Sequence, residues 1–379
     1  IALAADPNNI FYDYLMMPRS VAFSDWEPYR GSNWKRADGK PAAYVVDHSS
    51  APRNPYWSTE RNSNLDKRDR YISFAALDFT FTNWLSLKLR TGMDNYNFRY
   101  ETVRATGNPY WENGGSYRVQ QEGFKELNSD FLFTAKGSAG KFGILGTLGG
   151  NIMYRSTTFT NSWSGELEIP DFYSVVNGKT RQAAEASKSR KQINSLYGTA
   201  SLSWDNYLYL DLTGRNDWSS TLPKDNYSYF YPSVGASWVF TQMLNNMGKK
   251  TGLLTFGKLR ASWAQVGNDT DPYMLRDYLT PNYNIKDDQF TLVNKNWMAN
   301  PNLKNETIES WEFGVELRGF NDRFGVDLSY YKKNAKDQIL KISVPEASGF
   351  QYKMINAGNI QNKGWELAVR YDKKFGDFG

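Results

Sequence analysis

The feature that most limits how this chain can fold is a two-residue alternation of apolar and polar side chains. Its clearest instance spans residues 311–331, where apolar residues occupy every second position on both sides of a tight turn at Asn321-Asp322. The apolar set is Trp311, Phe313, Val315, Leu317, Phe324, Val326, Leu328 and Tyr330. Because successive side chains of a strand point to opposite faces, this pattern predicts a β-hairpin with one apolar and one polar face.

The same alternation returns along the chain, most clearly at 85–90, 208–213, 234–240 and 365–371. We expect about eleven strands in all. Their predicted centres lie near residues 77, 88, 131, 148, 199, 210, 236, 260, 314, 327 and 367. The fold class is therefore all-β.

The predicted connections alternate between short and long. The short ones are 82–84, 136–141, 205–206 and 321–323, and the medium connection 241–255 is grouped with them. The long ones run roughly over 97–124, 154–191, 214–229, 265–307 and 333–362, with 11–70 as a further long segment. Outer-membrane barrels place short turns on the periplasmic side and long loops outside, whereas soluble sandwiches do not usually sort their loops in this way. We therefore predict a transmembrane antiparallel β-barrel.

Aromatic residues flank the predicted short turns, as expected for the interfacial girdle of such a barrel. They are Trp84, Trp204, Tyr207, Phe320 and Phe324. The polar face carries many charges, namely Lys88, Arg90, Asp211, Glu312, Glu316, Arg318, Asp327, Glu366 and Arg370. A small barrel filled by its own side chains cannot hold so many charges. A wide barrel of roughly 22 strands can, and eleven strands would form half of its wall.

Composition argues against most other classes of function. The chain of 379 residues has no Cys and one His, His48, so thiolate sites are excluded and imidazole chemistry has almost no basis. A net charge of +5, with both signs interspersed, does not favour nucleic-acid binding. We find no nucleophile, metalloprotease or phosphate-loop motif and expect no enzyme and no cofactor. Asp269 and Asp271 lack the surroundings of a calcium loop, so no metal site is predicted.

Several long segments carry more specific motifs than the alternation alone. The first, 208–223, reads Leu-Tyr-Leu-Asp-Leu-Thr-Gly-Arg-Asn-Asp-Trp-Ser-Ser-Thr-Leu-Pro. The others are 228–234, 257–263, 266–273, 300–307, 310–312, 330–340 and 355–366. From about Asp69 to the C-terminus, these segments and their order resemble the SusC/RagA family of TonB-dependent outer-membrane transporters.

The resemblance implies active import of nutrient oligomers, either glycans or peptides, across the outer membrane of a Gram-negative bacterium. It implies a SusD-like surface lipoprotein as partner and TonB as the energy source, acting through a plug domain and TonB box expected upstream of residue 1. Residues 1–70 are then expected to form an extracellular loop region leading into the barrel, and residues 71–379 part of the transmembrane wall. It also implies contact with the lipid bilayer and with the oligomer substrate, and it implies no nucleic-acid partner.

Aromatic residues of the predicted loops are the candidates for substrate contact, because a flat ring offers stacking at little rotamer cost. They are Tyr56, Trp57, Trp111, Trp163, Trp218 and Trp297. Packing between loops, or contact with the partner lipoprotein, is the competing interpretation of each ring. Arg215 or Asp217 is expected to pin its loop through an ion pair.

Two other functions remain open at this point. A siderophore or vitamin receptor would share the barrel, although such receptors do not usually carry the segments above. A soluble, aromatic-rich β protein that binds glycans would share the composition, and it would stay in solution without detergent.

Overall fold

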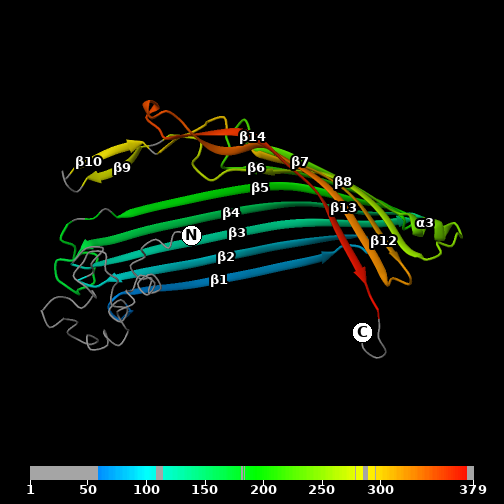
Figure 1. Cartoon of the computed structure of the whole chain (residues 1–379), viewed down its shortest axis with the longest axis horizontal. Coiled ribbons are helices and arrows are strands. Elements are labelled where there is room, and N and C mark those ends of the chain that lie inside the picture. The colour runs from blue at the N-terminus through cyan, green and yellow to red at the C-terminus, as the bar shows by residue number, and fades with distance from the viewer. Residues whose placement is uncertain are drawn as a thin grey trace, which may run out of the picture.

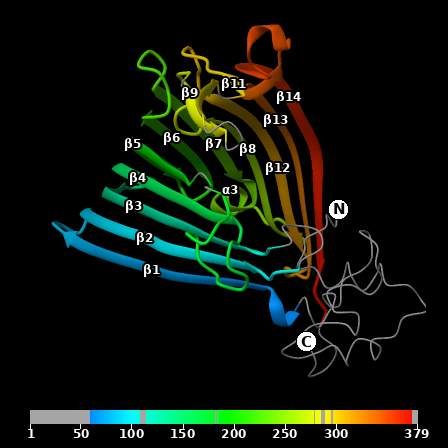
Figure 2. The same ribbon diagram turned by 90° about the vertical axis from the view of Figure 1, so that its left-hand side faces the viewer.

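The computed structural model describes residues 59–107, 114–180, 182, 184–277, 279–284, 289–294 and 296–373. They form one large, curved β-sheet (Figures 1 and 2). Its long strands are β1 (Ser63–Thr80), β2 (Leu85–Arg104), β3 (Ser116–Ala139), β4 (Phe142–Glu166), β5 (Glu185–Trp204), β6 (Leu208–Ser219), β7 (Ser228–Val239), β8 (Leu254–Asn268), β12 (Glu306–Gly319), β13 (Phe324–Ser343) and β14 (Tyr352–Tyr371). These are the eleven strands predicted from the alternation.

Each long strand pairs with its neighbour in antiparallel register, in chain order from β1 to β8 and then through β12, β13 and β14. The connection between β8 and β12 carries a hairpin, β9 (Leu279–Asn284) with β10 (Gln289–Asn294), and the short β11 (Trp297–Met298), which adds to β14 in parallel. No described helix is long and apolar enough to cross a membrane.

The short connections all lie at one end of the sheet, as predicted. Figure 1 shows them together with helix α3 (Phe240–Asn246), which joins β7 to β8. Asp205 and Asn206 adopt positive φ angles of 49° and 58°, the conformation that a tight hairpin turn requires and that Asn and Asp tolerate. The Phe240 ring of α3 packs over Gly257 of β8, where a Cβ atom would collide with it.

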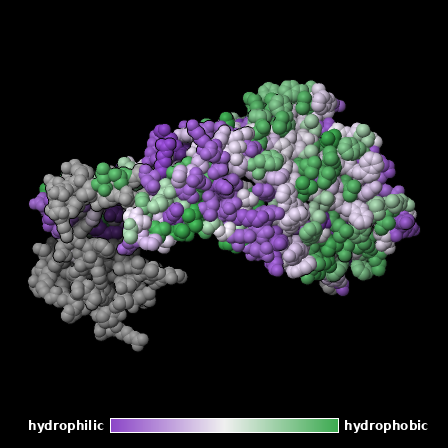
Figure 3. All heavy atoms as spheres, turned by 90° about the horizontal axis from the view of Figure 1, so that it is seen from above, coloured by the Kyte–Doolittle hydropathy of each residue, from purple (hydrophilic) through white to green (hydrophobic). Residues whose placement is uncertain are grey.

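One face of the sheet is apolar across all the long strands. Val315 lies directly opposite Leu328, and the row continues through Leu259 and Trp238 on one side and Leu367 on the other. Leu367 leaves 65% of its surface exposed. Figure 3 shows apolar residues gathered toward the short-turn end, with more polar residues toward the other end. A continuous apolar surface of this extent needs an apolar environment around it.

The opposite face is polar, and charges on it pair between adjacent strands and also across an intervening strand. The Arg260 guanidinium lies 2.8 Å from Asp327 and 3.7 Å from Glu312, and Arg90 lies 2.8 Å from Asp130. The register places all nine charged residues predicted for this face on it, namely Lys88, Arg90, Asp211, Glu312, Glu316, Arg318, Asp327, Glu366 and Arg370.

The long connections are shorter than predicted, because the strands continue well past the apolar band. The observed connections are 105–115, 167–184, 220–227, 269–305 and 344–351, the last holding the 3₁₀ helix η3 (Glu346–Ser348). The expectation of loops over 97–124 and 154–191 was therefore wrong for much of each range. Beyond the band the apolar row is not continued, so the alternation that reveals a strand in the sequence disappears while the backbone ladder continues.

Candidate functional site

The extended ends of β1–β4 carry a row of aromatic rings on the polar face. In β2 the odd positions Leu85, Leu87 and Leu89 belong to the apolar face, but farther along the strand the aromatic residues occupy even positions. We call this surface the upper polar face. It consists of Arg68, Tyr96, Phe98, Tyr100, Arg118, Glu122, Phe124, Arg155, Phe159 and Trp163.

Strand register brings these rings into contact. Tyr96 lies directly opposite Phe124, and their rings stack with centroids 5.0 Å apart at an interplanar angle of 12°. Phe98 and Tyr100 follow on the same strand, with centroids 6.5 Å apart at the same angle. Cross-strand aromatic pairs of this kind stabilise a sheet and hold each ring in one orientation.

Guanidinium groups cover several of the rings. Arg68 lies 5.1 Å from the centroid of Tyr96 and 5.0 Å from that of Phe98. Arg118 lies 5.1 Å from the Trp163 ring, and Arg155 lies 5.9 Å from the Phe124 ring. These distances are those of cation–π contacts. The upper polar face therefore presents flat apolar surfaces bordered by positive charge.

Carboxylates complete this surface and fix its polar groups. The Tyr96 hydroxyl donates to Glu122 at 2.5 Å, and Arg155 donates to Glu126 at 2.8 Å. Arg70 donates to Asp94 through two nitrogens, at 2.9 and 2.6 Å. Half-buried rings with ordered donors and acceptors beside them can stack a sugar ring or an aromatic side chain and hydrogen-bond its polar edge.

The structure places three of the six predicted contact residues. Trp163 lies in β4 as part of the upper polar face, and Trp297 lies in β11 with the Lys341 ammonium 5.6 Å from its ring. Trp218 lies in β6 on the apolar face, opposite Asn194. Trp163 and Trp218 were expected in loops, and both lie in strands. Tyr56, Trp57 and Trp111 fall outside the described residues.

The sequence prediction missed most of the upper polar face because, of the aromatic residues in the loops predicted over 97–124 and 154–191, it selected only Trp111 and Trp163. The sequence does contain an indication of this face. Within a single predicted strand and its extension, the large side chains change from odd-numbered to even-numbered positions, or the reverse. In β3, Phe131 and Phe133 share the apolar face, whereas Phe124 lies on the polar face. A strand that leaves a bilayer no longer needs an apolar outer row, so its rings can point inward.

The long-connection end of β5–β8 is built differently, around buried ion pairs. Asp269 lies 2.5 Å from the Lys191 ammonium, accepts from Thr221 at 3.0 Å and also accepts from Ser219. Its side chain is only 5% exposed. Asp269, considered above as a metal ligand, is thus bound by protein groups, and no group of three or more possible ligands occurs among the described residues.

The predicted ion pair between Arg215 and Asp217 is present, at 2.8 Å. Both residues lie in β6 rather than in a loop, since that strand continues to Ser219. Asp217 also accepts a hydrogen bond from Tyr231 at 2.5 Å, and Arg215 donates to Ser195 at 2.9 Å. The pair therefore fixes β5, β6 and β7 to one another, whereas it was expected to pin a loop.

Comparison with known proteins identifies relatives of the whole described sheet. A family model for the TonB-dependent receptor-like β-barrel matches residues 8–379. TonB-dependent receptor P26 of Formosa agariphila is 28% identical over 327 residues, covering 83% of this chain and 33% of that protein. TonB-dependent receptor SusC of Bacteroides thetaiotaomicron is 22% identical over 381 residues, covering 93% of this chain and 36% of that protein. The chain thus spans about a third of the length of each.

Solved structures share the fold. The RagAB peptide transporter superposes with a TM-score of 0.77 at 21% identity, over 88% of this chain and 38% of that chain. The same importer in its open-open state gives a TM-score of 0.74. At this level of identity the likeness concerns the fold, and it matches the curved sheet described above to part of a barrel wall.

Proposed function

Because the chain belongs to the TonB-dependent receptor-like β-barrel family, we propose that it forms part of the wall of an importer of nutrient oligomers in the outer membrane. In this proposal the apolar face contacts lipid and the polar face lines the lumen. The upper polar face carries the proposal, since it adds aromatic and charged contacts on the lumen side of strands that extend beyond the bilayer.

The proposed substrates are glycan or peptide oligomers. Both classes offer flat or apolar groups that can stack on Phe98, Phe124 or Trp163, and polar groups that can bond to the neighbouring guanidinium and carboxylate groups. Stacking surfaces in a row suit an extended, repeating ligand better than a compact chelate. This favours oligomer import over uptake of a siderophore or vitamin.

The proposed partners follow from the relatives. The full transporter would work with a SusD-like surface lipoprotein over the long-loop end and would draw energy from TonB through a plug domain. RagAB, whose fold this chain shares, is described as a peptide transporter. Residues 1–70 would then lead from an outer loop region into the wall that follows.

Copurification tests this function directly. The full-length transporter is extracted from outer membranes in mild detergent, and bound proteins and small molecules are identified by mass spectrometry. We expect a surface lipoprotein in stoichiometric amount, with an oligosaccharide or peptide bound. A lone barrel carrying an iron chelate would support the siderophore receptor instead, and recovery in the soluble fraction would refute the proposal.

A matched pair of variants tests the site. Phe124→Ala removes a ring from the upper polar face, whereas Phe131→Ala removes one from the apolar face of the same strand. Loss of one stacking partner should weaken binding of the copurified oligomer by roughly 1 kcal/mol, about fivefold. Phe131→Ala should leave oligomer affinity unchanged, as measured by calorimetry on the purified complex. Equal effects from both variants would argue against a lumen site on β3.

A further inference from the structure

Two lysines lie directly opposite each other just beyond the apolar band. Lys332 of β13 faces Lys363 of β14 in the antiparallel register. Each lies two residues past a ring of the apolar face, Tyr330 in β13 and Trp365 in β14, and so shares their side of the sheet. Like charges in this position repel each other, which destabilises the pairing unless an anion lies between them.

The described residues supply no such anion. No described carboxylate lies within salt-bridge distance of Lys332 or Lys363. The nearby acidic residue on the same face, Glu309, already pairs with Lys336 at 2.8 Å and accepts from the Trp263 indole at 3.2 Å. Two positive charges therefore remain together at the edge of the apolar band.

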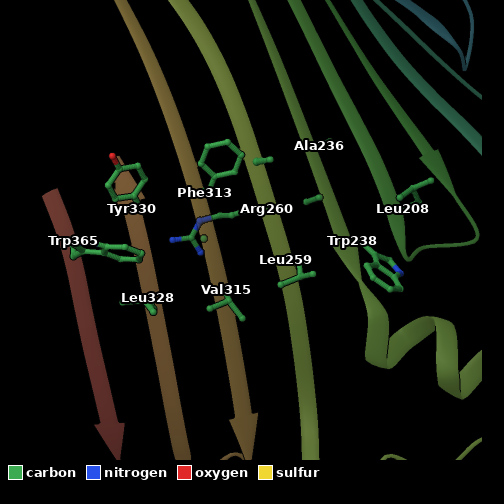
Figure 4. Close-up of a pocket in the computed structure, with 13 residues that line it drawn as sticks. Leu208, Ala236, Trp238, Leu259, Arg260, Phe313, Val315, Leu328, Tyr330 and Trp365 are labelled. Atoms are coloured by element: carbon green, nitrogen blue, oxygen red, sulfur yellow. The ribbon is translucent and has the colours of Figure 1, made fainter. Parts of the chain in front are cut away.

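An apolar hollow lies immediately below them, with a volume of about 690 Å³. Ala236 and Ala261, which are directly paired, make its floor, and Trp238 and Phe313 rise beside them (Figure 4). Its far side is bounded by Tyr330 and Trp365, whose ring centroids lie 4.9 Å apart. The lysines follow these two rings by about 7 Å along their strands.

We propose that this combination is a binding site for a phosphate-bearing membrane lipid, with the phosphate between Lys332 and Lys363 and an acyl chain in the hollow. The inference rests on the proposed function, since it requires the apolar face to meet lipid. Paired ammonium groups give charge-assisted hydrogen bonds to phosphate oxygens, and the small floor residues leave room for a chain. The charge above and the apolar hollow below match the two ends of one amphipathic molecule.

Native mass spectrometry of the full-length transporter in detergent tests the site, with dimyristoyl phosphatidic acid as the probe. Replacing both lysines, Lys332→Gln with Lys363→Gln, should weaken binding at least about tenfold, because two charge-assisted hydrogen bonds are lost. The control, Lys258→Gln with Lys333→Gln, removes the same charge from the polar face of β8 and β13 and should bind like the wild type. Equal binding by all three proteins would overturn the proposal.

Two further experiments test which parts of the lipid contribute to binding. Ala261→Phe should fill the hollow and weaken binding of the dimyristoyl lipid, but not of its dihexanoyl analogue. Inorganic phosphate that competes as well as the lipid would show a simple anion site and would contradict the acyl contact. Uptake of oligomer by the lysine double variant is measured in parallel. If the lysine double variant takes up oligomer normally and still binds lipid like the wild type, only this inference is contradicted. If the wild-type protein is absent from the outer membrane, the proposed function is contradicted.

Discussion

The two halves of the long-connection end are built differently. On the side of β1–β5 the strands themselves continue, so β3 and β4 are 24 and 25 residues long. On the side of β6–β8 the strands are 12 to 15 residues long, and the connections between them pack together. Leu222, Leu303 and Tyr229 form a buried cluster there, and Leu303 is fully buried.

This difference separates two ways of holding a polar surface in place. In the β1–β5 half, ladder hydrogen bonds fix the backbone, and the charged pairs on it are largely exposed, as in Arg155 with Glu126. In the β6–β8 half, fewer ladder bonds are available, and a buried pair between Lys191 of the adjoining β5 and Asp269 fixes the connection that follows β8. The first half can change its side chains at little cost, which suits the substrate contact proposed for it, whereas the second cannot.

The largest effect is expected at the buried pair. Asp269→Ala leaves the Lys191 ammonium, 16% exposed, without its carboxylate. Breaking a buried pair in this way costs about 3–5 kcal/mol. Hydrogen exchange over residues 269–277 in the full-length protein should show the loss as easier local opening. Glu126→Ala, which frees an exposed arginine, should cost about 1 kcal/mol or less. Similar losses of stability from both variants would contradict the proposed difference between the halves.

An intermediate effect should be shared by both halves, because the apolar band runs through each. Leu89→Arg in β2 and Leu210→Arg in β6 each place a charge on the apolar face, which is proposed to contact lipid. Near the bilayer midplane either change should cost about 2–4 kcal/mol, and Val326→Arg in β13 should behave alike. Asp327→Asn, on the lumen face, should cost much less. Urea unfolding of the full-length protein in lipid vesicles gives these values, and equal costs on the two faces would contradict the register.

The smallest effect concerns pH and the exposed contact of Asp171 with Arg61 and Tyr173, in the connection that follows β4. Burial opposes ionisation of Asp171, but hydrogen bonds from Arg61 at 2.6 Å and Tyr173 at 2.9 Å bring its pKa below the usual value. Because the pKa of Asp171 is lower in the folded protein, its contacts with Arg61 and Tyr173 stabilise the connection at neutral pH. This stabilisation is lost as acid protonates the carboxylate. Proteolysis of 167–180 should therefore accelerate at low pH, and Asp171→Asn should remove most of that dependence. A pH response that Asp171→Asn leaves unchanged would assign it to another group.

Much of the sheet could be predicted from the sequence, because a continuous apolar face requires an apolar side chain at every second residue. The eleven strands, the short-turn end and the face of each charged residue follow from that rule, as the hairpin at Asn321-Asp322 illustrates. Strand length could not be predicted in the same way. Residues 116–124 of β3 and 154–166 of β4 are polar on one or both sides, and only pairing with their neighbours identifies them as strand.

The candidate site was harder to predict for the same reason. Tyr96 and Phe98 lie in a stretch that resembles a polar loop, so their rings were not distinguished from solvent-exposed ones. Trp218 shows the converse: it belongs to a segment with loop-like composition, yet the strand carries it onto the apolar face. Which side a ring faces depends on register, and register beyond the apolar band is fixed by contacts distant in sequence.

Site-directed spin labelling along β13 of the full-length transporter in lipid vesicles tests the two-faced wall most directly. Single labels at consecutive positions from Val326 to Lys332 are compared for collisions with oxygen, which concentrates in lipid, and with a water-soluble nickel chelate. The two-faced wall predicts oxygen access at 326, 328 and 330, nickel access at 327, 329 and 331, and a change to nickel access at 332. Uniform access to the nickel chelate, or alternation that continues unchanged through 332, would contradict a lipid-facing wall that ends at Tyr330.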